Sequence, residues 1–249
     1  MNRQPDAGVE LLDWLDERLA EHLGRIEQSP AYQCVAAAET SAALATAVVR
    51  EILLEVFSYG PLIVEATCTA IGRWPKNRPD LMKMATTHIL DEVDHSEVAL
   101  SDYVRLGGDE RWARQRRLSP AALAMAATCK LLAERENPFA YLGFMYLFEA
   151  LTPTLSQRAM QALARKHFPA AAQTFIDLHA TEDVKHTAFL RGLITKVVRD
   201  FPDAAAAIQY GLECFACVWP LPVWDAAYAR ALAGVPAEER EAAELAATA

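Results

Sequence analysis

The sequence predicts an all-α protein, a single compact bundle of about seven to eight helices. Alanine occurs 47 times and glycine 10 times in 249 residues, a composition that favours helices. The regular alternation of β-branched residues that strands require is missing. Prolines stand at the starts of most apolar-periodic segments, and no long Gly/Ser linker separates them. We expect one domain over residues 1–234.

Each helix is predicted from amphipathic spacing and local stop signals. In chain order, the expected helices cover residues 11–28, 32–59, 61–73, 80–106, 120–134, 138–166, 169–200 and 202–232. Prolines stand at or just before six of these starts, where their missing N–H is tolerated. Pro153 lies inside a helical pattern and should kink it. Gly107 and Gly108 should end the helix before them, and the Ala- and Glu-rich tail 235–249 should be a short surface helix or frayed.

Charge and hydropathy exclude several classes of protein. A net charge of −9 argues against nucleic-acid binding, which needs a basic surface. Uncharged runs reach only 12 residues, so no membrane span is expected, and the first residues lack a secretory signal pattern. Five scattered cysteines do not make a disulfide framework. We therefore expect a cytoplasmic protein. The one dense basic cluster is expected to be a solvated turn and consists of Arg111, Arg114, Arg116 and Arg117.

Two glutamates lie in apolar helical surroundings. Glu65 is the only charged residue between Glu55 and Arg73, and Glu149 is the only one in the segment 139–153. An unpaired buried carboxylate costs several kcal/mol and is seldom left without a partner. Each could instead lie at a helix edge where it reaches solvent, and for one isolated glutamate that simpler interpretation would prevail.

Histidines and carboxylates share one face of two further helices. His88, Glu92 and His95 are spaced i, i+4, i+7, and the same spacing recurs in His179, Asp183 and His186. A single histidine on an apolar face is usually a core residue. The repetition on two helices favours a common site.

Together the four segments match a carboxylate-bridged dinuclear metal site in a helical bundle. Carboxylates would bridge and neutralise two hard divalent cations, and imidazoles would cap each metal. The four carboxylates that would balance two Fe(II) ions are Glu65, Glu92, Glu149 and Asp183. The residues also leave open a metal-free helical pocket or a structural polar network.

The motif from Glu149 to His179-x3-Asp183-x2-His186, with a Glu92-x2-His95 helix upstream, resembles the haem-oxygenase-like di-iron oxidases, which are related to TenA-like and PqqC-like proteins. The resemblance covers roughly residues 50–200 and implies a haem-oxygenase-like fold. The metal-binding and catalytic residues that it implies are Glu65, His95, Glu149, His179, Asp183 and His186, with Glu92 as an additional carboxylate. His88 has no primary ligand position in this scheme and would be a partner of a ligand, a substrate contact or a polar core residue.

Such a site predicts an O2-activating non-haem di-iron oxidase or oxygenase. We expect two Fe ions that bind O2 as co-substrate, form a peroxo-bridged di-iron(III) species and oxidise a small substrate. By the resemblance, that substrate is an amino acid, an amine or a fatty acid of specialised metabolism. The alternatives are a ferritin-like di-iron N-oxygenase, a metal-free TenA-like or PqqC-like enzyme, and a non-enzymatic metal-binding helical protein.

The sequence does not choose among these substrates. An amino acid would need a cation for its carboxylate, and the candidates are Lys83, Lys130, Arg158 and Lys185. A fatty acid would need a long apolar slot. An external reductant and a homodimer are compatible with the sequence, although no heptad seam specifies a dimer.

Overall fold

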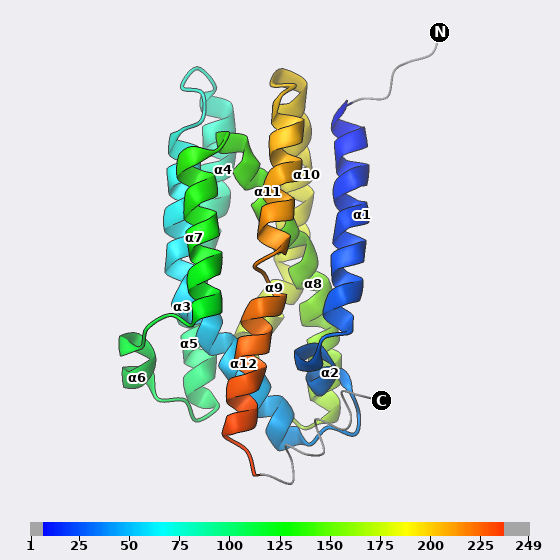
Figure 1. Cartoon of the computed structure of the whole chain (residues 1–249), viewed down its shortest axis with the longest axis vertical. Coiled ribbons are helices and arrows are strands. Elements are labelled where there is room, and N and C mark those ends of the chain that lie inside the picture. The colour runs from blue at the N-terminus through cyan, green and yellow to red at the C-terminus, as the bar shows by residue number, and fades with distance from the viewer. Residues whose placement is uncertain (1–6, 237–249) are drawn as a thin grey trace.

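The computed structural model describes residues 7–236, which form helices and no strand (Figure 1). In chain order the elements are α1 (Ala7–Glu27), α2 (Pro30–Ala36), α3 (Ala42–Gly72), α4 (Pro79–Glu92), α5 (His95–Arg105), α6 (Glu110–Gln115), α7 (Pro120–Arg135), the 3-10 turn η1 (Pro138–Ala140), α8 (Tyr141–Arg165), the 3-10 turn η2 (Ala170–Ala172), α9 (Thr174–Thr181), α10 (Asp183–Asp200), α11 (Ala204–Ala216) and α12 (Leu221–Ala233). The long helices lie roughly along the long axis of the molecule (Figure 1). The all-α prediction is confirmed.

The described residues contain more helices than the seven to eight predicted, because four long predicted segments are interrupted. The segment 32–59 breaks at residues 37–41 between α2 and α3. The segment 80–106 breaks at Val93 and Asp94 between α4 and α5. Both α4 and α5 pack against α3, while α4 also contacts α10 and α5 also contacts α9. The segment 169–200 divides near Glu182 into α9 and α10, and the segment 202–232 divides before Pro220 into α11 and α12.

Helix α3 differs from prediction in the opposite way. Pro61 was expected to begin a helix, but α3 continues through it from Ala42 to Gly72. An interior proline removes one backbone hydrogen bond and costs roughly 3 kcal/mol. Residues on both sides of Pro61, among them Leu54 and Ala70, are buried in the core, and this burial outweighs the cost.

Helices α8 and α11 cross at very short range. A Cβ atom added to Gly143 would overlap the Ile208 carbonyl oxygen, and one added to Gly211 would overlap the Ala140 carbonyl oxygen. Glycine at both positions therefore lets the two backbones touch. This crossing fixes α8, which carries Glu149, against the rest of the bundle.

Helices α11 and α12 together form the one stretch of the described residues that is long and apolar enough to span a membrane by length and composition, Ala204–Ala233. Its mean hydropathy is 1.2. The stretch is divided at Pro220, and its halves pack on different partners, α11 on α8 and α12 on α3.

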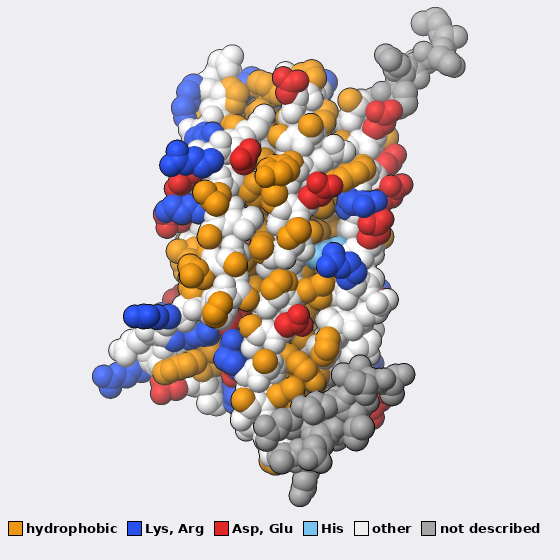
Figure 2. Space-filling model, in the orientation of Figure 1, with side chains coloured by type: hydrophobic (Ala, Val, Ile, Leu, Met, Phe, Trp, Pro, Cys, Tyr) orange, Lys and Arg blue, Asp and Glu red, His pale blue; other side chains and the backbone are white. Residues whose placement is uncertain are grey.

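The basic cluster after α5 is more structured than predicted. Residues 110–115 form α6, whose first turn is capped by Asp109, the side chain of which accepts a hydrogen bond from the Trp112 N–H. Arg116 is buried and donates to Glu55, a fully buried carboxylate of α3. The solvated-turn prediction is therefore wrong for Arg116. On the face shown in Figure 2, Asp and Glu side chains follow the outer side of α1, and Arg and Lys gather near α6.

Gly107 adopts a positive φ of 86° after α5, as the predicted helix stop requires. The single domain over residues 1–234 stays a prediction. Of the predicted tail 235–249, only Val235 and Pro236 belong to the described residues; the remainder lies outside them.

Candidate metal centre

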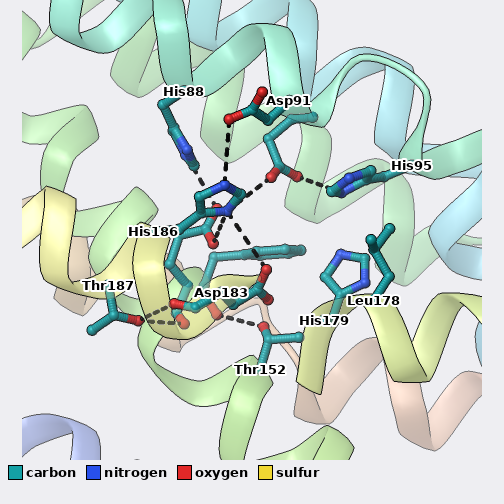
Figure 3. A network of polar contacts seen from close by, with 12 residues as sticks. His88, Asp91, His95, Thr152, Leu178, His179, Asp183, His186 and Thr187 are labelled. Carbon is teal, nitrogen blue, oxygen red and sulfur yellow. Dashed lines mark hydrogen bonds and ion pairs between the residues drawn. The ribbon is translucent and has the colours of Figure 1, made fainter. Parts of the chain in front are cut away.

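Five helices bring histidines and carboxylates to one buried spot. Helix α4 provides His88 and Glu92, α5 begins with His95, α8 provides Glu149, α9 provides His179, and α10 provides Asp183 and His186. Figure 3 shows the His186 ring between His88 and Asp91 on one side and Asp183 on the other. Six of the seven predicted site residues therefore converge, although they span almost 100 positions of the chain.

The first group consists of His88, Glu92, Glu149 and His186. One candidate ligand atom from each lies within 4.8 Å of all the others. His186 Nδ1 lies 3.3 Å from Glu149 Oε2 and 3.2 Å from Glu92 Oε1. His88 Nε2 lies 3.2 Å from Glu149 Oε1. Two imidazoles and two carboxylates at this spacing form a donor set suited to iron.

The second group consists of Glu92, His95 and His179, again with ligand atoms within 4.8 Å of one another. His95 Nδ1 lies 2.8 Å from Glu92 Oε2, and the His95 and His179 rings meet edge to face with centroids 4.8 Å apart. Glu92 thus directs Oε1 to the first group and Oε2 to the second. A carboxylate shared between two groups is the arrangement that a bridging ligand requires.

Asp183 has the environment of a metal ligand. The residue is 1% exposed, and neither of its carboxylate oxygens has a hydrogen-bond partner. Oδ1 lies 3.6 Å from His186 Nδ1. Burial, followed by repulsion from Glu149 and Glu92, raises the pKa of Asp183 to about 7. A buried carboxylate without donors is costly, and a divalent cation would satisfy it.

The positive charge that balances the carboxylates of the cluster lies on protonated His186. Burial lowers the pKa of His186, but Asp183, Glu149 and Glu92 outweigh burial and raise it to about 12. Burial also raises the pKa of Glu92, but His186 and His95 hold it well below its usual range. The His186 imidazolium therefore supplies positive charge to the crowded carboxylates. Divalent cations would take over this role and displace the proton.

Outer contacts orient two of the imidazoles. His179 Nδ1 donates to the Phe175 carbonyl at 2.8 Å, which leaves Nε2 unprotonated and free for a metal. Asp91 Oδ2 lies 3.7 Å from His186 Nε2, on the ring side away from the other carboxylates. Carbonyl and carboxylate partners of this kind fix the tautomers and orientations of metal-binding histidines.

The structure does not bring Glu65 to the cluster, so its predicted position among the ligands is wrong. Gly60, Ile63, Val64 and Thr67 form the face of α3 that lines the cavity beside the centre. Glu65 follows Val64 by about 100° around the helix, is exposed, and lines a surface groove with residues of α7. Glu65 is the only charged residue in this apolar stretch because it lies at the edge of α3 that faces solvent.

His88 enters the cluster instead. It was predicted to lie outside the primary ligand positions, yet it is buried and its Nε2 faces Glu149. The signal that could have identified it is its i, i+4 spacing to Glu92, which places both side chains on one face of α4.

A cavity of about 60 Å³ opens on the cluster between α3 and the ligand-bearing helices. It is lined by His88, Glu92, His95, Glu149 and His179 on one side and by apolar residues of α3 and α8 on the other. Residues of both groups of donors therefore border open space beside the cluster, as a centre that binds a substrate requires.

Comparisons with known proteins show the family and the fold of this chain. A family model described as "Iron-containing redox enzyme" matches residues 62–219. No curated protein matches the chain significantly. A domain of unknown function with a haem-oxygenase-like fold from Shewanella denitrificans OS217 is similar with a TM-score of 0.72 and 17% identity, over 88% of this chain and 92% of that one. A TenA homologue from Pseudomonas syringae pv. tomato DC3000 is similar with a TM-score of 0.65 and 13% identity, over 88% and 93%. These two likenesses show that the fold is haem-oxygenase-like, as predicted.

Proposed function

Because the chain belongs to the family of iron-containing redox enzymes, we propose that it is a non-haem di-iron oxidase that uses O2 to oxidise a small substrate. The observation that carries the proposal is Asp183, whose two buried oxygens lack any hydrogen-bond partner beside two groups of donors that share Glu92. A structural polar network would satisfy these atoms internally. The ferritin-like alternative is set aside, since the fold is haem-oxygenase-like.

The residues fit two irons. His88, Glu149, Asp183 and His186 would hold one ion, His95 and His179 would hold the other, and Glu92 would bridge them. When bound, Fe(II) would supply electrons for the reduction of O2, and O2 would be the oxidant of the substrate. The protein supplies the fixed imidazole tautomers and the carboxylate charge. Ile63, Val64, Phe144 and Phe148 form the apolar wall that limits water at the donor atoms.

Metal counting tests the proposal directly. We expect the purified apoprotein, titrated anaerobically with Fe(II), to bind two irons per chain and to develop a transient visible absorption band when O2 is added. Glu149→Ala and His179→Ala should bind fewer. Glu65→Ala is the matched control, since it removes an exposed glutamate outside the cluster, and it should bind as the wild type does. Fewer than one iron in the wild type, or unchanged binding in both ligand variants, would contradict the proposal.

Four further features stay proposals. We expect an external reductant to return the oxidised centre to Fe(II) after turnover. We also expect a cytoplasmic location and a role in the biosynthesis of specialised metabolites. A homodimer is the remaining expectation, and equilibrium sedimentation of the purified chain would test it.

A further inference from the structure

The outer side of α7 is apolar. The first part of this helix, residues 120–129, carries no charge, yet Leu123, Ala124 and Ala127 are exposed, and so is Leu131 two turns after Leu123. Leu123 is 57% exposed and Leu131 is 58% exposed. Hydrophobic side chains lie along the lower part of α7 in Figure 2, where Figure 1 locates its start. A helix that is apolar on every side is normally buried, so this is a surface that another element would cover.

Helix α3 packs against α7 and extends this surface. A groove of about 220 Å³ runs between the two helices. Leu62 and Glu65 line it from α3, and Leu123, Ala127 and Lys130 line it from α7. We call these five residues the α3–α7 face.

Opposite charges lie on the two sides of the groove. Glu65 belongs to α3 and Lys130 to α7. Within one chain they do not pair with each other, because Lys130 Nζ lies 3.6 Å from Glu134 Oε1 and no described residue forms an ion pair with Glu65. The Glu65 carboxylate is therefore available to a cation of another molecule.

The two helices run in the same direction. Ser119, at the start of α7, donates a hydrogen bond to Glu55, and Arg73, after the end of α3, donates one to the Ala133 carbonyl. Glu65 and Lys130 therefore lie within about one helical turn of the same height along the groove.

A two-fold axis along the groove makes this face complementary to itself. Rotation about that axis places α3 of one copy over α7 of the other. Each Glu65 then lies opposite the partner's Lys130, and the exposed leucines of both copies lie between the two pairs. Closed dimers use one such self-complementary surface on both subunits. A different protein would have to carry both charges at matching positions, whereas a second copy of this chain carries them by symmetry.

We infer that the α3–α7 face is the interface of a homodimer, in which Glu65 of each subunit pairs with the partner's Lys130. The inference goes beyond the proposed function, because the face contains none of the donor residues of the metal centre. The opposite side of α3, with Ile63 and Val64, lines the cavity at that centre. The partner therefore supports this helix from outside.

Charge reversal tests the interface. We expect the wild type to sediment at equilibrium as a dimer, and a series of chain concentrations gives its dissociation constant. Glu65→Lys and Lys130→Glu each place like charges opposite one another twice per dimer, so each should weaken dimerisation at least tenfold. Glu17→Lys makes the same change at an exposed position of α1 and is the matched control.

A mixture of the two charge variants tests the pairing itself. The Glu65→Lys chain has lysine at both positions and the Lys130→Glu chain has glutamate at both, so a mixed dimer contains only opposite pairs. We expect the mixture to regain the dimer of the wild type, although neither variant dimerises well alone. No change within a monomer could produce this rescue.

An apolar position provides an independent test. Leu123→Glu places a charge in the middle of the α3–α7 face and should weaken dimerisation at least tenfold. Val9→Glu, which changes an exposed apolar residue of α1, is its control and should not. Circular dichroism checks that every variant is folded.

The outcomes separate this inference from the proposed function. A monomeric wild type would overturn the inference, and so would a dimer that both charge variants leave intact, since it would use another face. A mixture that stays monomeric would overturn the pairing of Glu65 with the partner's Lys130. Glu65→Lys should still bind two irons per chain, and failure of the wild type to bind metal would contradict the proposed function alone.

Discussion

Glu92 is the residue on which the two halves of the centre depend. Its two oxygens lie 3.2 Å from His186 Nδ1 and 2.8 Å from His95 Nδ1, and these histidines come from different helices. The one-turn spacing of Glu92 and His95 made both predictable. Which oxygen serves which group was not predictable, because it depends on the break between α4 and α5.

His88 provides a test at the residue scale. We expect His88→Gln to weaken metal binding at least tenfold and to reduce the count toward one ion per chain, because the variant removes an imidazole that faces Glu149. Anaerobic Fe(II) titration with metal analysis measures both. His22→Gln, which changes a buried histidine of α1, is the control. If His88→Gln and His22→Gln bind metal equally well, His88 is a polar core residue and not a metal ligand.

A second residue-scale prediction concerns pH and stability. His22 Nε2 donates to the Trp219 carbonyl at 2.9 Å, and burial lowers the pKa of His22 below its ordinary value of 6.5. The unfolded chain therefore binds a proton at a higher pH than the folded chain does. The stability that neutral His22 provides is complete above about pH 6.5 and is lost as the pH falls through that value.

His22→Gln should reveal this contribution. At about pH 8 the variant should be less stable than the wild type by about 1 kcal/mol, the worth of the lost hydrogen bond. The difference in urea midpoint between the wild type and the variant should decrease as the pH falls toward about 5.5. The reason is that protonation of His22 favours the unfolded chain, and the variant lacks this histidine. A gap that is constant or wider at low pH would show that His22 is not held neutral.

At the scale of elements, Pro153 allows a hydrogen bond between two ligand-bearing helices, α8 and α10. Because proline has no N–H, the Glu149 carbonyl loses its partner within α8. That carbonyl instead accepts a hydrogen bond from Thr187 Oγ1 of α10 at 2.8 Å, and it shares this donor with the Asp183 carbonyl at 2.7 Å (Figure 3). The sequence showed a proline inside a helix and predicted a kink. It did not show the cross-helix bond, because Thr187 lies 34 positions later and only packing brings it near.

A double-mutant cycle tests this connection. Thr187→Val should destabilise the protein by roughly 1–3 kcal/mol, since it leaves a buried carbonyl without a donor. In the Pro153→Ala background, where α8 regains an N–H for Glu149, the same change should cost much less. Thr195→Val is the control, because its hydroxyl donates only within α10. Urea unfolding measures the stability lost through Thr187→Val in each background. Equal losses would contradict a hydrogen bond from Thr187 to the Glu149 carbonyl.

The crossing of α8 and α11 gives another element-scale prediction. Gly143→Ala should destabilise the protein by about 3 kcal/mol or more, because the new methyl group would overlap the backbone of α11. Gly192→Ala on α10 meets nothing within 4 Å and should be neutral or stabilising by up to about 1 kcal/mol. Thermal unfolding of both variants measures the difference, and similar melting temperatures would contradict the close approach.

The helices themselves were predictable to different degrees. Local signals located α7, where Ser119 caps the first turn and Pro120 begins the helix. They failed at Pro61, where burial on both sides carries α3 through a residue that normally starts or breaks a helix. They also missed the breaks near Val93 and Glu182, where neighbouring helices, not local sequence, determine the direction of the chain.

At the scale of the whole molecule, the bundle converges on the centre from helices far apart in sequence. The residues of that centre were nearly all predictable, since repeated histidine and carboxylate spacing is a local signal. The apolar cavity among α2, α3, α8 and α9 was not predictable, because four helices form it together and no single segment carries its pattern. Glu65 was not predictable in this way, because the sequence around a single carboxylate in an apolar helix does not show which face of the helix packs against the bundle.

The central claim is that this centre holds two iron ions that share Glu92. Anomalous diffraction at the iron absorption edge from crystals grown anaerobically with Fe(II) tests it most directly. We expect two peaks per chain, roughly 3.5–4 Å apart, one beside His88, Glu149 and His186 and the other beside His95 and His179. A single peak, or peaks only elsewhere on the molecule, would contradict it.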